Sequence, residues 1–386
     1  MMTATATDSL RATTSTVVRL ATASDDAARR ALMSAVPMDA ELALSVRRSP
    51  TMSALYALHA RDWREWVVER DAAVVGTGSV LVRDGWLDGR RVPVGYLGDL
   101  RLAPVVQGRL LLDRFYGPIL RDAADEWSCE YFVTAIIGSN LRARRALVAR
   151  PARAERAGRP RYTLLREFDI RAIQLVLPLL PERSDWHVRR ATEADIPAIA
   201  RLLDADGRSR PFGYVVDEAE LRRRLATWPG LTIDSFLVAT GADGTPVGTL
   251  ALWDAAPVKE TVVASYSGSM RRVRMIHDIM ATVLRRPPLP EPGAPLRYVY
   301  ATHVAVPPGE PSLLRALLRA AYGRARATGF HFISACAPVG DANDTAYRGM
   351  VVTNLRAELH LVTLPGVALP LIPPASPMPG LEMALV

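Results

Sequence analysis

The pattern of apolar and polar residues predicts short strands and amphipathic helices along the whole chain. The clearest helix covers 311–328. Its apolar residues recur every three or four positions and share one face, while arginines lie off it: Leu313, Leu314, Leu317, Leu318, Ala321 and Tyr322. Such spacing is typical of a helix that buries one side. The strands alternate with helices, which favours an α/β fold with a mixed sheet covered on both faces.

Three short segments recur in the same order, which indicates an internal duplication. The pairs are 21–25 with 191–195, 75–77 with 247–249, and 132–135 with 332–335. The spacing between partners lengthens only before the third pair, so an insertion is expected in the second copy at about 257–295. Chance similarity in a chain rich in alanine and arginine is the alternative explanation.

The duplication predicts five segments. Residues 1–16 form a flexible arm, 17–177 the first copy, 178–186 a linker, 187–365 the second copy, and 366–386 a proline-rich tail. Because repeated prolines prevent a helix, the tail is expected to be an extended strap on a surface. Gly117-Pro118 is expected to break or kink the helix around it.

The segment 100–109 carries the most specific motif. A strand ends at Leu102, Pro104 follows, and Gln107-Gly108-Arg109 precedes a helix. Backbone N–H groups entering a helix can cradle a pyrophosphate, and an arginine adds a charged fork. This succession resembles the GNAT acyltransferase superfamily, and the resemblance covers nearly the whole chain twice. It therefore implies two tandem GNAT-like domains.

The resemblance also implies an acyl-coenzyme A site, in which acetyl-CoA is the simplest co-substrate. Leu100 and Leu102 would pair with the pantetheine amides, Gln107, Gly108 and Arg109 would hold the pyrophosphate, and Asn140 would lie near the pantetheine arm. Three positions depart from the family: Leu110 and Leu112 replace small residues, and Leu147 replaces a tyrosine. The matching loop of the second copy contains Glu310 and Pro311, so that copy is expected to bind a pyrophosphate poorly.

Acyl transfer to an amine needs a group that removes a proton from the amine. The candidates for this catalytic role are Asp99, beside the cofactor strand, its repeat counterpart His303, and Glu130 at the start of the next strand. An ordinary structural role is the alternative for each of them.

A second set of candidates concerns the substrate. Lys259, the only lysine of the chain, lies between Trp253 and Tyr266 at the mouth of the insertion. A lysine is a compact point charge whose pKa shifts readily, so these three residues are candidates for binding an anionic substrate group. A surviving surface lysine is the alternative.

The composition narrows the class of protein. The formal net charge is +8, almost all of it from arginine, but the chain has no zinc-finger or RNA-binding motif, so nucleic acid is an unlikely partner. Cys129 and Cys336 show no metal or disulfide spacing, and no metal is expected. Without a signal peptide or an apolar run of spanning length, a cytoplasmic location and no membrane partner are expected.

The function expected from these features is an N-acyltransferase, most simply an acetyltransferase, that acts on a small-molecule amine held between the copies. The rival interpretation is a non-catalytic GNAT-fold module that binds a ligand or supports an assembly. A role in RNA binding would rest on charge alone. The sequence does not predict an oligomeric state.

Overall fold

The computed structural model describes residues 16–36, 42–106, 115–148, 159–373 and 376–386. The strands are β1 (Thr16–Leu20), β2 (Leu42–Arg48), β3 (Asp62–Arg70), β4 (Ala73–Leu87), β5 (Arg90–Leu102), β6 (Tyr131–Ile137), β7 (Arg161–Gln174), β8 (His187–Arg190), β9 (Gly213–Tyr214), β10 (Phe236–Thr240), β11 (Pro246–Trp253), β12 (Lys259–Tyr266), β13 (Tyr298–Ala305), β14 (Phe332–Pro338) and β15 (Val352–Thr363). The helices are α1 (Asp26–Ala35), α3 (Gly117–Trp127), α4 (Leu141–Ala143), α6 (Ile196–Ser209), α7 (Glu218–Thr227), α8 (Gly268–Val283) and α9 (Pro311–Ala327), with short helical turns between them.

The strands repeat one order in the two halves. Most of them form one mixed sheet in the order β1-β3-β4-β5-β6-β15-β7-β14-β13-β11-β10-β8. From each outer edge inward, β1-β3-β4-β5-β6 corresponds to β8-β10-β11-β13-β14. The fifth strand runs parallel to the fourth in both halves, β6 against β5 and β14 against β13. The predicted α/β class with a mixed sheet is therefore confirmed.

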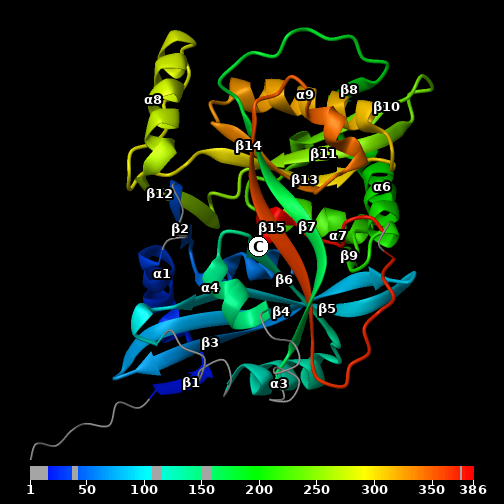
Figure 1. Cartoon of the computed structure of the whole chain (residues 1–386). Helices are drawn as coiled ribbons and strands as arrows, with labels where there is room; N and C mark the ends of the chain where they lie inside the picture. Colours follow the sequence, from blue (N-terminus) through cyan, green and yellow to red (C-terminus); the bar gives the residue numbers. More distant parts are fainter. Residues whose placement is uncertain (1–15, 37–41, 107–114, 149–158, 374–375) are drawn as a thin grey trace, which may run out of the picture.

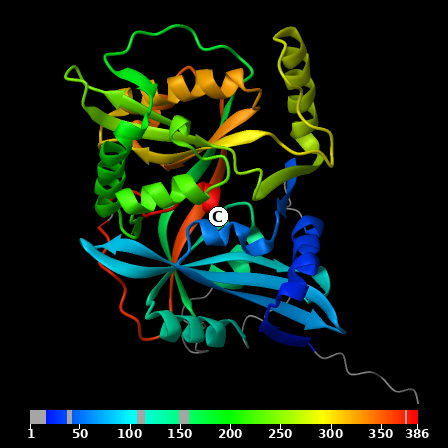
Figure 2. The ribbon, with the colours of Figure 1, turned by 180° about the vertical axis from the view of Figure 1, so that it is seen from behind.

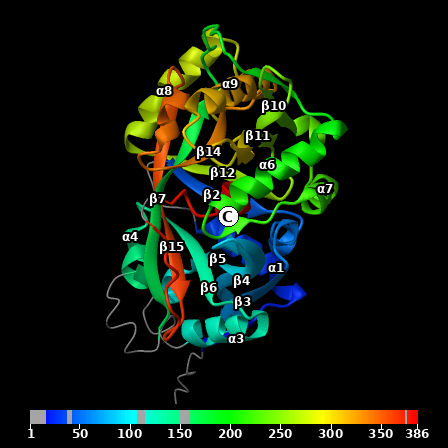
Figure 3. The same ribbon diagram turned by 90° about the vertical axis from the view of Figure 1, so that its right-hand side faces the viewer.

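The last strand of each copy joins the halves. β15 inserts between β6 and β7, and β7 pairs on its other edge with β14 of the second copy. Figures 1 and 3 show β7 and β15 side by side, running from one half of the molecule to the other. Because these strands pair with both copies, the division of the chain at 178–186 stays a prediction.

In the second copy helices cover both faces of the sheet. Because neighbouring residues of a strand point to opposite sides, each strand contributes to two cores. Val238 and Ala251 pack with α6 and α7 in one core, whereas Leu237 and Leu250 pack with α9 in the other. The helix predicted at 311–328 is α9, and its predicted apolar face is buried.

The two copies begin with the same local contacts. Asp25 receives hydrogen bonds from both the backbone and the hydroxyl of Thr22, and from the guanidinium of Arg19 at 2.8 and 2.9 Å. Asp195 receives the corresponding hydrogen bonds from the backbone and the hydroxyl of Thr192, and from the guanidinium of Arg189 at 2.7 Å. These contacts lie at the first pair of recurring segments, and they support the duplication.

The two copies differ between their third and fourth strands. A turn of Asp88 and Gly89 joins β4 to β5, whereas β12, α8 and a loop separate β11 from β13. β12 pairs antiparallel with β2 of the first copy and so forms a second bridge between the halves. Figure 2 shows α8 standing apart from the remainder of the second half.

Two local expectations can be compared with the structure. Pro118 lies in the first turn of α3, directly after a π-helical turn at residues 115–116, so the helix changes type beside Gly117-Pro118. Because residues 107–114 lie outside the described part, the expected break or kink stays a prediction. The first part of the tail is exposed, as expected for a strap on a surface, but its end turns inward: Ala384 and Leu385 are buried in a hydrophobic core, and the C label marks this end at the centre of the molecule in Figure 1. Gly380 permits this course, because a Cβ there would lie 2.2 Å from the carbonyl oxygen of Phe212.

Candidate functional site

The strand β5 carries a bulge beside an open edge. Its pairing with β4 shifts register around Asp99, and Asp99 adopts a positive φ of 51°, which a residue with a side chain rarely does. The parallel partner β6 pairs with β5 only from Val94 to Tyr96. Beyond Tyr96, none of the described strands pairs with that edge. Leu100 is exposed and Leu102 half-buried along this stretch.

β13 repeats the bulge in the second copy. The register against β11 shifts at the same place, and His303 has a φ of 50°. Such a conformation costs on the order of 1–3 kcal/mol and persists only where the surroundings impose it. The shared bulge supports the alignment of His303 with Asp99 that the repeat predicted.

Asp99 is held in a buried ion pair. Both of its carboxylate oxygens accept from Nη2 of Arg48 at 3.0 Å, and the Tyr56 hydroxyl donates to it at 2.5 Å. Burial raises the pKa of Asp99, but Arg48 and Tyr56 outweigh burial and lower the pKa to about 2. A carboxylate that acidic and so fully engaged is a poor acceptor for an amine proton.

Lys259 lies in the same cluster. It is the register partner of Arg48 between β12 and β2, and its Nζ donates to the backbone oxygens of Met383 and Val386. Burial lowers its pKa to about 7, with a further contribution from Arg48, while Asp99 and Glu382 act in the opposite direction. The carboxylates of Asp99 and Glu382 both raise the pKa of Lys259. The clusters around the two bulges therefore meet at this lysine.

A cavity of about 230 Å³ opens beside Lys259. Tyr298 and Tyr300 line it, and their hydroxyls are 2.8 Å apart, with Thr261 extending the chain at 2.9 Å. The ammonium group of Lys259 lies 5.3 Å from the centre of the Tyr300 ring. Three further charged residues line the cavity as well: Arg297, Asp254 and Glu260. A polar group that enters it would therefore meet charges of both signs and a row of hydroxyls.

His303 is the centre of a buried relay in the second copy. Its Nε2 lies 3.1 Å from Nη1 of Arg224, its Nδ1 lies 3.0 Å from the Thr302 hydroxyl, and that hydroxyl donates to Glu382 at 2.6 Å. Because a guanidinium only donates, Nε2 must accept and Nδ1 carries the proton. Burial and Arg224 hold the pKa of His303 well below its usual range. Both ring nitrogens are engaged, so this histidine has no free position for a substrate proton.

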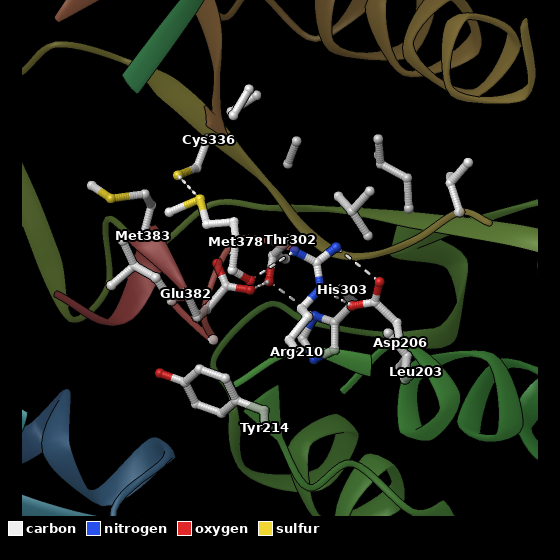
Figure 4. Close-up of a pocket in the computed structure, with 18 of the residues that line it drawn as sticks. Leu203, Asp206, Arg210, Tyr214, Thr302, His303, Cys336, Met378, Glu382 and Met383 are labelled. Atoms are coloured by element: carbon white, nitrogen blue, oxygen red, sulfur yellow. Dashed lines mark hydrogen bonds and ion pairs between the residues drawn. The ribbon is translucent and has the colours of Figure 1, made fainter. Parts of the chain in front are cut away.

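Glu382 is the residue that the sequence analysis missed. It lies in the tail, lines a cavity of about 200 Å³, and points toward Thr302, as Figure 4 shows. Burial raises its pKa, and hydrogen bonds from Thr302 and from the backbone of Ala384 and His303 oppose that shift. A proline-rich tail gives no signal that one of its carboxylates will be buried, so only the tertiary structure identifies it.

The remaining candidates lie apart from these clusters or outside the described residues. Glu130 is exposed at the start of β6. Asn140 caps α4 by accepting from the backbone of Ala143 at 3.0 Å. Trp253 has no exposed surface and donates to the carbonyl of Pro229, and the Tyr266 hydroxyl donates to the carbonyl of Pro290.

The residues predicted to hold the pyrophosphate lie outside the described residues: Gln107, Gly108 and Arg109. In the part of the chain that is described, no group of three His, Cys, Asp or Glu side chains is positioned to hold a metal ion.

Comparison with known proteins shows a likeness in structure. No family model and no curated protein sequence matches the chain. A GCN5-related N-acetyltransferase from Sphaerobacter thermophilus gives a TM-score of 0.50 at 15% identity, over 92% of this chain and 98% of that chain. A tandem GNAT protein from the clavulanic acid biosynthesis pathway gives a TM-score of 0.52 at 11% identity, over 92% of this chain and 100% of that chain.

The N-myristoyltransferase of Saccharomyces cerevisiae, in a structure with bound myristoyl-CoA, gives a TM-score of 0.56 at 12% identity. The match covers 98% of this chain and 88% of that chain. At such identities the likeness concerns the fold. The repeated strand order, the repeated bulge and these neighbours agree: the chain has the tandem GNAT fold.

Proposed function

We propose that this protein is an acyl-CoA-dependent N-acyltransferase, most simply an acetyltransferase, that acts on a small-molecule amine. The observation that carries the proposal is the edge of β5 at residues 97–101, where β6 has diverged and none of the described strands lies beside the bulge at Asp99. Pantetheine carries amides that can pair with such an edge. The resemblance assigns this pairing to Leu100 and Leu102, and the pyrophosphate to Gln107, Gly108 and Arg109.

The acceptor is proposed to lie between the two bulges, with Glu382 as its proton acceptor. The amine nitrogen attacks the thioester carbonyl, the carbon–sulfur bond breaks, and the amine proton passes to the carboxylate of Glu382. Burial raises the pKa of Glu382, which brings its basicity closer to that of a useful general base. Coenzyme A leaves as a thiolate. Because a thiol has a pKa of about 8.5, the thiolate needs no strong acid to depart.

Lys259 is proposed to hold the substrate at this centre. The lysine lies beside a cavity with three hydroxyl groups, which suits an anionic or strongly polar group of the acceptor. Asp99 is then a positioning residue that holds Arg48 through the ion pair, and Trp253 and Tyr266 support the surrounding core.

One specific observation favours the rival, a non-catalytic module. Asp99 and His303, two of the three predicted bases, are both fully engaged by protein groups. In that case the chain would bind an acyl-CoA without transferring the acyl group.

Calorimetric titration with acetyl-CoA, followed by a thiol-release assay with a panel of small amines, separates the two functions. We expect binding of one acetyl-CoA, loss of binding in Arg109→Ala, and normal binding in Arg91→Ala, an exposed arginine at the start of β5, at the end of that strand far from the predicted loop. Glu382→Gln should still bind but release thiol about 10²–10⁴-fold more slowly. Binding without thiol release by the wild type, or absence of binding, would overturn the proposed transferase and support the non-catalytic module.

A further inference from the structure

The helix α8 carries an apolar face that points to solvent. Met275, Ile276, Ile279 and Val283 recur at helical spacing and are 59%, 55%, 60% and 76% exposed. The only buried residue of the helix is Ala281. A row of large aliphatic side chains on one exposed stripe is uncommon on a surface and marks an interaction site.

Two charged residues of α8, Arg274 and Asp278, contact the loop that follows the helix. Arg274 pairs with Asp278 and with Glu291 of that loop, and the backbone N–H of Leu289 donates to Asp278 at 2.8 Å. The guanidinium of Arg274 also lies 4.9 Å from the centre of the Tyr266 ring. The helix is therefore fastened by its polar side, and its apolar side is left uncovered.

The charges around the apolar face are positive at both ends. Arg271 and Arg272 are exposed in the first turn, and Arg285 is exposed just after the last turn. The only acidic residue within α8 is Asp278, which points inward and is paired. The partner that fits this face is therefore apolar in the middle and anionic at its rim.

We propose that α8 docks this protein on the surface of an anionic lipid bilayer, with the helix axis in the plane of the membrane. Met275, Ile276, Ile279 and Val283 enter the boundary between headgroups and acyl chains, and the flanking arginines contact lipid phosphates. A basic amphipathic helix with an aliphatic face binds membranes in this way. Its 16 residues span about 24 Å, which gives a contact several lipids long.

The same charges argue against a second copy of the chain as the partner. A two-fold contact places identical patches against each other. With arginines at both ends of α8 and no free carboxylate on its outward face, a parallel or an antiparallel pairing would bring arginine against arginine. In the described part of the chain no helix is long and apolar enough to cross a membrane, so the proposed binding is peripheral.

Vesicle sedimentation tests the proposal with the full chain. Vesicles of phosphatidylcholine and phosphatidylglycerol in equal parts are compared with vesicles of phosphatidylcholine alone. We expect the wild type to sediment with the anionic vesicles only, and to dissociate as NaCl is raised from about 0.1 M to about 0.5 M. Ile276→Asn/Ile279→Asn should lower the partition coefficient about tenfold or more, since two large aliphatic side chains leave the bilayer.

The matched control is Leu180→Asn/Leu371→Asn, which changes two leucines that are 83% and 87% exposed elsewhere on the surface. It should bind the anionic vesicles like the wild type, and far-UV circular dichroism should show that both variants are folded. Equal binding to neutral vesicles, absence of binding, or equal loss in both variants would overturn the proposal. A wild-type dimer that the α8 variant converts to a monomer, without vesicle binding, would instead assign the face to self-association.

Discussion

At the scale of single residues, burial decides what the charged side chains between the copies can do. Asp99 and His303 were predicted as bases from their positions in the repeat, and their positions at the two bulges agree with that alignment. Their partners Arg48 and Arg224 come from β2 and α7, which lie outside the three recurring segments, so the sequence could not show that both would be engaged. The role of Glu382 could not be predicted from the sequence either, because residues distant in sequence form its environment.

The titration of Lys259 gives a test of this buried cluster. Its pKa is about 7 in the folded protein, whereas an unfolded lysine titrates near 10.4. Between these values the unfolded chain holds a proton that the folded chain lacks. The unfolding free energy of the wild type should therefore rise with pH relative to Lys259→Met, by at most about 1.4 kcal/mol per pH unit. Below about pH 7 the difference between the two proteins should be constant.

Urea unfolding of both proteins at several pH values between about 6 and 10 measures this difference. The comparison with Lys259→Met cancels the titration of the other groups, because methionine keeps most of the volume without the charge. Parallel curves over the whole range would show that Lys259 keeps an ordinary pKa and is not buried as described.

At the scale of elements, the recurring segments at 21–25 and 191–195 specify the same structure twice. Each places an aspartate that completes a capping box with the threonine three residues earlier, in the turn that leads into the first helix, and that pairs with an arginine of the preceding strand. These interactions act over six residues or fewer, so the sequence was sufficient to predict the helix starts.

The two caps should make similar contributions to stability. Arg19 and Arg189 hold the pKa of Asp25 and of Asp195 well below the usual range, with help from the neighbouring threonines. Asp25→Ala and Asp195→Ala should each lower the unfolding free energy by about 1 kcal/mol near pH 7. The loss should shrink as pH falls below about 4, where the unfolded carboxylates take up protons and the wild type loses the same stability.

Chemical unfolding of the two variants measures these contributions, and Glu193→Ala is a suitable control, because Glu193 is exposed in the same turn as Asp195 and should be close to neutral. A large effect of one aspartate and none of the other would argue against equivalent roles for the two segments.

At the scale of the whole molecule, the two copies share one sheet. β15 pairs with β6 and β7, and β7 pairs with β14, so neither half completes its sheet alone. The pairing of β2 with β12 and the burial of the tail between the halves add to this connection. The exposed face of α8 is also a feature of the whole molecule, and the lipid surface proposed for it is a partner that the sequence analysis did not expect.

Shared strands predict that the halves unfold together. Differential scanning calorimetry of the full chain should show one transition, because separating the copies would expose the paired edges of β15 and β7 and their cores. A fragment covering 17–177 should aggregate, since β6 and β7 would then lack the strand between them. Two resolved transitions, or a monomeric and folded fragment, would show that the copies are independent domains.

The sequence by itself determined the duplicated order of strands and helices, the capped helix starts and the mixed α/β class, because periodicity and short-range contacts are written in neighbouring residues. It also singled out Asp99, His303 and Lys259, which the structure brings to the contact between the copies. Only the tertiary structure decided the exchange of the last strands, the inward course of the tail with Glu382, and the pairing that lowers the basicity of Asp99 and occupies His303. These features depend on contacts between residues far apart in the chain, and a pattern read along one strand or helix does not contain them.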